Sequence, residues 1–221
     1  MWYVKNTLTR KNLMALTGLF LSFFLIIHLA GNFQLLLPKE EAQLQYNWYS
    51  HFLAGNPLVK IISYVLYASI ILHVVVSIYL TIKARKARGA RLARDRRGRA
   101  SKWYTRNMMF LGTIVLVFLI IHFKDFWYIY KFGEVPLDTG GNKDLYTLVV
   151  NAFSELWYVI VYIIGIIALG YHLLHGVFSA HRTLGLYNPF YSQLVRYIGV
   201  AFAIIMTIGY IIIPIYVYLN Q

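Results

Sequence analysis

Five apolar runs constrain the fold of this 221-residue chain most strongly, because each approaches or exceeds the roughly 20 residues that a helix needs to cross a bilayer core. Only 13% of the residues are charged and 59% are hydrophobic, which excludes an ordinary water-soluble domain. We therefore predict an all-α membrane protein with a single domain over residues 1–221. Its five transmembrane helices are expected near residues 13–37, 58–82, 108–130, 156–179 and 197–218.

The distribution of charge predicts how the bundle is oriented. Residues 83–102 contain ten basic residues and one acid. A basic tract can indicate nucleic-acid binding, but this one lies between two predicted spans, and the positive-inside rule explains it better. With this loop in the cytoplasm, 16 of the 21 Lys and Arg residues lie inside and seven of the eight acids outside. We expect a cytoplasmic N-terminus, a C-terminus outside, and no nucleic-acid partner.

Four of the seven histidines each lie inside a different apolar run: His28, His73, His122 and His172. Imidazole is costly in hydrocarbon, so an intramembrane histidine usually has a partner or a function. A helix rise of about 1.5 Å per residue places His73 and His172 about 13–15 Å from the inner helix ends. The same arithmetic places His28 and His122 about 25–28 Å from those ends. The histidines thus form two layers, and each layer offers two imidazoles to the two faces of a haem.

The absence of cysteine narrows the cofactor chemistry further. It excludes disulfides, thiolate-held iron–sulfur clusters and covalently attached haem in this chain. A zinc site is less attractive, because no carboxylate or thiolate joins either histidine pair. Proton relays and simple packing are the remaining alternatives. Two haem b groups, each with two histidine ligands, explain the pattern best.

Three glycines occupy levels at which a porphyrin edge would pass a helix. Gly18 and Gly112 each lie ten residues before one of the outer-layer histidines and so fall near the inner layer, while Gly165 falls near the outer layer. Small residues also pack membrane helices together, which is the alternative explanation.

Three further residues near the inner layer could contact a haem. His175 lies one helical turn after His172 and is a second choice as axial ligand, or a partner for a propionate. Arg182 and His181 are candidates for propionate contacts. A solvated pair at the membrane boundary accounts for the last two equally well.

Several motifs resemble the dihaem cytochrome b membrane subunit of succinate dehydrogenase and fumarate reductase. They are MALTG at residues 14–18, HLAGN at 28–32, YHLLHGVFS at 171–179 and RTLG at 182–185. The resemblance extends over nearly the whole chain, with five spans and one histidine in each of the first four.

The resemblance implies two haem b groups, with His73 and His172 proximal to the cytoplasm and His28 and His122 distal. It also implies a flavoprotein and an iron–sulfur subunit on the cytoplasmic face. Electrons would pass between the iron–sulfur subunit and a membrane quinone, usually menaquinone. The dicarboxylate site would lie on the flavoprotein, so we assign no catalytic residue here. The expected location is the bacterial cytoplasmic (inner) membrane, as a multi-pass protein.

A quinone pocket near the distal haem would need polar groups for two carbonyl oxygens. The candidates by depth are Asn32, Gln34, Trp48 and His51. Two other functions compete with this interpretation. The chain could be the cytochrome b subunit of another membrane dehydrogenase, such as a formate or hydrogen enzyme, or a histidine-dependent transporter. The scarcity of carboxylates within the spans argues against the transporter.

Overall fold

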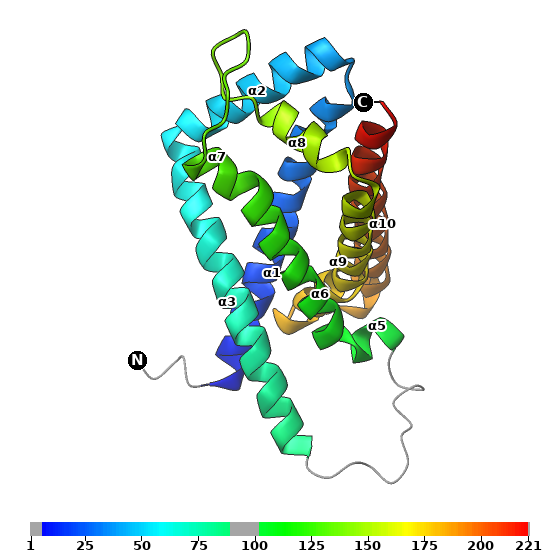
Figure 1. Ribbon diagram of the computed structural model, residues 1–221. Coiled ribbons are helices and arrows are strands. Elements are labelled where there is room, and N and C mark those ends of the chain that lie inside the picture. Colours follow the sequence, from blue (N-terminus) through cyan, green and yellow to red (C-terminus); the bar gives the residue numbers. More distant parts are fainter. Residues whose placement is uncertain (1–5, 89–101, 221) are drawn as a thin grey trace.

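The computed structural model describes residues 6–88 and 102–220. In these residues, five helical segments are long and apolar enough to cross a membrane, as predicted, and they run alternately up and down the bundle (Figure 1). The middle of the basic tract, residues 89–101, lies outside the described residues. The elements are α1 (Thr7–Asn32), η2 (Phe33–Leu36), α2 (Lys39–Gly55), α3 (Pro57–Arg88), α5 (Trp103–Arg106), α6 (Met108–His122), η3 (Phe123–Tyr128), α7 (Ile129–Phe132), α8 (Leu145–Phe153), α9 (Leu156–Thr183) and α10 (Pro189–Leu219).

Two helices, α1 and α10, begin earlier than the apolar runs predicted, because polar caps define their first turns. α1 begins at Thr7 rather than near residue 13, and the Asn6 side chain accepts a hydrogen bond from the backbone N–H of Leu8. α10 begins at Pro189 rather than near residue 197. Asn188 caps it in the same way, and proline suits the first helical position. The spans themselves are confirmed.

Three elements between the spans complete the fold. The segment between the first two spans forms the helix α2. Two short helices, α5 and α8, were not predicted.

The third span changes to a π-helix, η3, directly after His122. Such wide turns are rare, and they often occur at functional sites.

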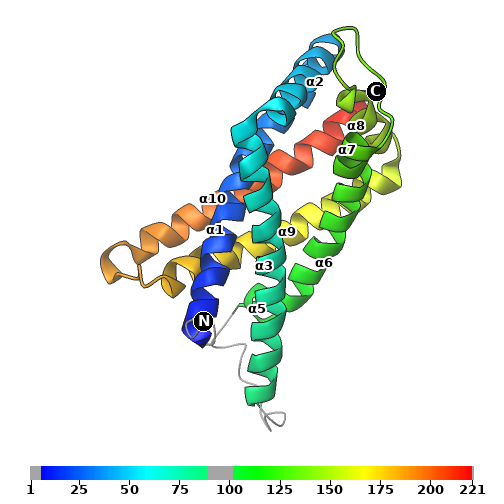
Figure 2. The same ribbon diagram turned by 90° about the vertical axis from the view of Figure 1, so that its left-hand side faces the viewer.

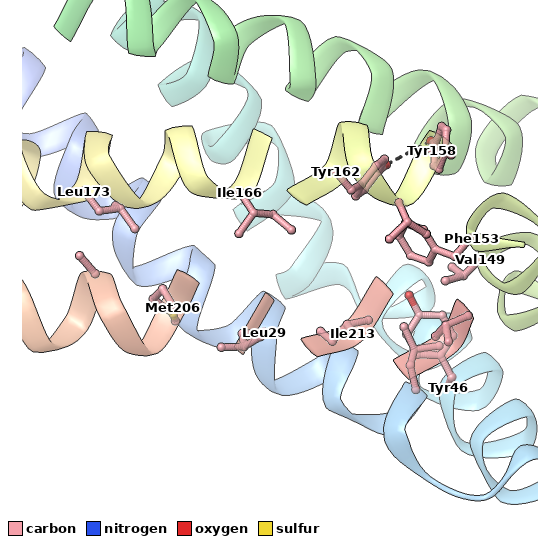
Figure 3. Packing of buried hydrophobic residues seen from close by; sticks show 14 residues of the cluster. Leu29, Tyr46, Val149, Phe153, Tyr158, Tyr162, Ile166, Leu173, Met206 and Ile213 are labelled. Atoms are coloured by element: carbon pink, nitrogen blue, oxygen red, sulfur yellow. Dashed lines mark hydrogen bonds between the residues drawn. The ribbon is translucent and has the colours of Figure 1, made fainter. Parts of the chain in front are cut away.

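The helix α9 lies at the centre of the bundle, where it packs against α10, α6 and α1, while α3 packs mainly against α1 (Figure 2). Glycines bring these helices close together. A Cβ atom added at Gly170 of α9 would collide with Thr207 of α10, and one at Gly209 would lie 2.8 Å from Leu29 of α1. Small residues at such crossings let membrane helices pack closely. The buried core of this region includes Ile166 and Met206 (Figure 3).

The two ends of the bundle differ in character. We call the end with α5 and the α9–α10 turn the basic end, since Lys83, Arg85 and Arg106 lie there. We call the other the capped end, because α2, α8 and the loop 133–144 lie across it (Figure 1). The predicted orientation would place the basic end in the cytoplasm.

A buried hydrogen-bond cluster holds the capped end together. Asn47 of α2 is 0% exposed, and its amide donates to Asp138 at 3.0 Å and to Asp144 at 2.9 Å. Its carbonyl oxygen accepts from the backbone N–H of Tyr146 at 2.8 Å. Asn47 therefore ties α2 both to the loop 133–144 and to the start of α8.

Replacing Asn47 by leucine should lower the free energy of unfolding by about 2 kcal/mol, because two carboxylates lose a buried donor. Thermal unfolding in detergent measures this loss. The matched control is Gln45→Leu on the same helix, where the exposed side chain bonds only Glu41 among the described residues. Equal melting temperatures for the two variants would contradict the role given to Asn47.

The same cluster gives the capped end a dependence on pH. Burial alone would raise the pKa of the Asp144 carboxyl, but hydrogen bonds from Thr147, Asn47 and Gln43 outweigh it and lower the pKa. A carboxyl with a lowered pKa stabilises the folded state above its unfolded pKa, near 4. That stabilisation is lost as the pH falls through the lower, folded value.

Candidate functional site

A cavity of about 2010 Å³ runs through the bundle between α1, α3, α6 and α9. Typical ligand pockets measure about 300–1,000 Å³, so this one has room for more than one such ligand. Its lining includes Lys11 and Thr105 at the basic end and Tyr46 and Tyr130 at the capped end. All four intramembrane histidines line it as well.

The histidines meet across the cavity in the pairs that their depths predicted. His73 of α3 and His172 of α9 have ring centroids 6.1 Å apart, with an angle of 62° between the rings. We call them the basic-end pair. His28 of α1 and His122 of α6 have centroids 5.7 Å apart and lie at 86°. We call them the capped-end pair.

These separations suit a metal ion held between two imidazoles. Each metal–nitrogen bond is about 2 Å long, so the ring centroids would lie roughly 6 Å apart across the ion. No group of three or more His, Cys, Asp or Glu side chains able to hold a metal ion occurs among the described residues. A group that brings its own equatorial ligands, as a porphyrin does, would therefore fit better than a bare ion.

Hydroxyl groups orient one histidine of each pair. Thr17 Oγ1 donates to the carbonyl of Leu13 at 2.8 Å and lies 3.2 Å from His73 Nδ1. It can therefore accept a hydrogen bond from that nitrogen. His122 Nδ1 lies 3.3 Å from Tyr162 Oη. With Nδ1 protonated in both rings, Nε2 is left as the free lone pair that a metal needs.

The other two histidines are held differently. His172 Nδ1 is buried and has no hydrogen-bond partner among the described residues. His28 stacks on Phe24 with ring centroids 5.3 Å apart. Its Nε2 lies 3.5 Å from the amide nitrogen of Asn32, at the outer limit of a hydrogen bond. That amide also donates to the His28 carbonyl at 2.7 Å, so the contact with the ring is the weaker one.

The two inner-level glycines face the basic-end pair, as their positions predicted. A Cβ atom added at Gly18 would lie 3.2 Å from His73 Cε1, and one at Gly112 would lie 3.7 Å from His172 Cε1. Both glycines line the cavity. Gly165 does not line it, because the ring of Phe118 lies 2.5 Å from the place of its missing Cβ. The clearance predicted at Gly165 serves Phe118 instead.

Among the candidates near the basic-end pair, only His175 lines the cavity, and its Nδ1 lies 3.2 Å from Thr105 Oγ1. His181 and Arg182 do not line it. The His181 ring packs against Tyr191 with centroids 5.9 Å apart. The Arg182 guanidinium lies 5.5 Å from the Tyr187 ring. The propionate contacts predicted for His181 and Arg182 are not supported, whereas Lys11, Lys83, Arg85 and Arg106 line the cavity at this end.

Of the four candidates for a quinone pocket, Asn32 alone lines the cavity. Tyr46 Oη donates to the side-chain carbonyl oxygen of Asn32 at 3.3 Å. The Gln34 amide donates back to the Gly31 carbonyl, at 3.2 Å. Trp48 is 59% exposed and stacks on Phe52, and His51 is exposed. Gln34, Trp48 and His51 therefore do not line the cavity, whereas Tyr46, which was not predicted, does.

Sequence reasoning missed the polar partners of the ligand candidates, Thr17 and Tyr162. Tyr162 lies ten residues before His172 on α9, which places it about 15 Å further along the helix, at the level of His122. Tyr162 could thus have been predicted from its depth along α9. Comparison of the chain with protein-family models, characterised proteins and solved structures gives no match.

Proposed function

We propose that this chain is the dihaem cytochrome b membrane anchor of a succinate:quinone oxidoreductase. The observation that carries the proposal is the stacking of two histidine pairs along one cavity through a five-helix bundle. The motifs around Thr17, His28 and His172 support the same family. The anchor would pass electrons between an iron–sulfur subunit and a membrane quinone.

Each histidine pair would hold one haem b. His73 and His172 would ligate the basic-end haem, and His28 and His122 would ligate the capped-end haem. Such a group supplies one-electron transfer, at a potential set by its ligands, their hydrogen bonds and burial. The chain itself contributes the four imidazoles, glycine clearance at the basic-end pair, and a largely apolar cavity wall.

The two ends of the cavity suit different neighbours. Lys11, Lys83, Arg85 and Arg106 offer cations near the basic-end pair, where propionates would be neutralised and an iron–sulfur subunit with its flavoprotein would dock. At the capped end, Asn32 and Tyr46 offer polar groups for the carbonyl oxygens of a quinone, with menaquinone as the family's usual choice. The protein would lie in a bacterial cytoplasmic membrane.

Purification through a tag on this chain tests the proposal. A flavoprotein and an iron–sulfur subunit should accompany it, and succinate should reduce its b-type absorbance. Reduction by formate or hydrogen instead would favour the cytochrome subunit of another dehydrogenase. A histidine-dependent transporter is disfavoured, since no Asp or Glu of the described residues lines the cavity. Purified protein without b-type absorbance would contradict the proposal.

A further inference from the structure

A chain of hydroxyl groups joins His122 to a carboxylate at the capped end. His122 Nδ1 lies 3.3 Å from Tyr162 Oη. Tyr162 Oη in turn lies 3.3 Å from Tyr158 Oη, the contact marked by a dashed line in Figure 3. Tyr158 Oη donates to Asp125 Oδ2 at 2.8 Å. The Asp125 side chain is 22% exposed, and its other carboxylate oxygen lies 3.1 Å from Lys124 Nζ. The π-helix η3 carries Asp125, so the wide turn after His122 places this carboxylate against α9.

The chemistry of these groups determines which one donates and which one accepts in each hydrogen bond. A carboxylate accepts hydrogen bonds and a phenol has one hydrogen to donate. The short bond to Asp125 uses the hydrogen of Tyr158, so Tyr158 accepts from Tyr162. Tyr162 in turn accepts from His122 Nδ1–H. His122 therefore stays in one tautomer, with Nε2 facing away from the chain of hydroxyl groups.

The other three histidines have no such connection within the described residues. His73 Nδ1 faces the neutral hydroxyl of Thr17, which donates onward to a backbone carbonyl. His172 Nδ1 has no partner there. His28 contacts the side-chain amide of Asn32. A negatively charged terminus is thus linked to one ligand of the capped-end pair and to neither ligand of the basic-end pair.

We propose that Tyr162, Tyr158 and Asp125 are positioning residues that hold His122 and lower the reduction potential of the capped-end haem. The inference rests on the proposed function. A ring N–H that donates toward a carboxylate makes the imidazole a more basic ligand. A more basic ligand stabilises the oxidised iron relative to the reduced iron. The aromatic rings of Tyr158 and Tyr162 also pack in the core, but packing alone would not require their hydroxyls.

Redox titration of the dihaem protein tests this role with two conservative variants. Asp125→Asn removes the negative charge and keeps the side-chain size. Tyr158→Phe interrupts the row of hydrogen bonds and keeps the aromatic ring. Each should raise the midpoint potential of one haem and leave the other unchanged. We expect about a tenfold change in the oxidised–reduced equilibrium, which is about 59 mV for a one-electron couple. Asp125→Glu should restore most of the original potential.

The matched control is Tyr210→Phe, since the Tyr210 ring lies 6.0 Å from His28 and its hydroxyl donates to the Leu25 carbonyl at 2.8 Å. This variant removes a hydroxyl beside the capped-end pair but leaves the hydrogen bonds between His122 and Asp125 intact. The midpoint potentials of both haems should therefore be unchanged. If the Tyr158→Phe protein fails to fold or to bind haem, the midpoint potentials of Asp125→Asn alone test the inference. Two bound haems with unchanged potentials in Asp125→Asn would overturn this inference and leave the proposed function standing. A wild-type protein without haem would overturn both.

Discussion

Replacing His172 by alanine should remove the basic-end haem and leave the capped-end haem in place. The reason is geometric, because the His172 ring lies 6.1 Å from the His73 ring and both line one cavity. Without one of its two axial imidazoles, a noncovalently held b-type haem loses most of its hold. Quantification of haem in the purified variant should therefore give about half the wild-type content, and His73→Ala should behave in the same way.

Two comparisons sharpen the test of the pairing. His122→Ala should remove the other haem, so the spectra of His122→Ala and His172→Ala should add up to that of the wild type. His175→Ala is the matched control, because His175 lies one turn further along α9, lines the same cavity and contacts Thr105. It should keep both haems. Loss of a haem from His175→Ala, with both retained in His172→Ala, would reverse the ligand assignment.

Introducing leucine at Gly18 should also remove the basic-end haem, although Gly18 is not a ligand. A Cβ atom there would lie 3.2 Å from His73 Cε1, and a leucine would extend further into the cavity. Overpacking of this kind forces neighbouring side chains away from their positions. His73 would lose its orientation and its hydrogen bond with Thr17. Haem quantification should show a loss as large as that in His73→Ala.

A graded series separates this effect from a general loss of folding. Gly18→Ala requires only a small movement of His73 and should retain most of the haem. Gly112→Ala should retain more, since its Cβ would make an ordinary contact with His172 Cε1 at 3.7 Å. Gly55→Leu adds the same side chain at the end of α2, where no atom lies within 4 Å of the added Cβ. Full haem content in Gly18→Leu would contradict the clearance role.

The spans and the histidine pairs could be predicted because both depend on position along a helix. Apolar length identifies a span, and a constant rise per residue converts sequence distance into depth. The depths of His28 and His122 hence agreed, and the structure brings their rings together. α1 and α10 begin earlier in the sequence than predicted, because helix caps rather than hydropathy determine where they start.

What a side chain faces around the helix could not be predicted in this way. Arg182 has a suitable depth for a propionate, yet it packs against aromatic rings beside the α9–α10 turn. Gly165 has a suitable depth for clearance, yet Phe118 fills the space beside it. The π-helix η3 rotates every later residue of the third span around the helix axis. The pattern of apolar residues in this run did not predict the π-helix. Contacts that depend on azimuth therefore needed the three-dimensional structure.

We propose that this bundle holds two haem b groups, one between the two imidazoles of each histidine pair. A reduced-minus-oxidised spectrum of the purified protein, combined with quantification of extracted haem, tests it most directly. We predict b-type absorbance with two noncovalently bound haems per chain. A protein that folds and purifies as a helical bundle but carries no haem, or a single one, would contradict the account.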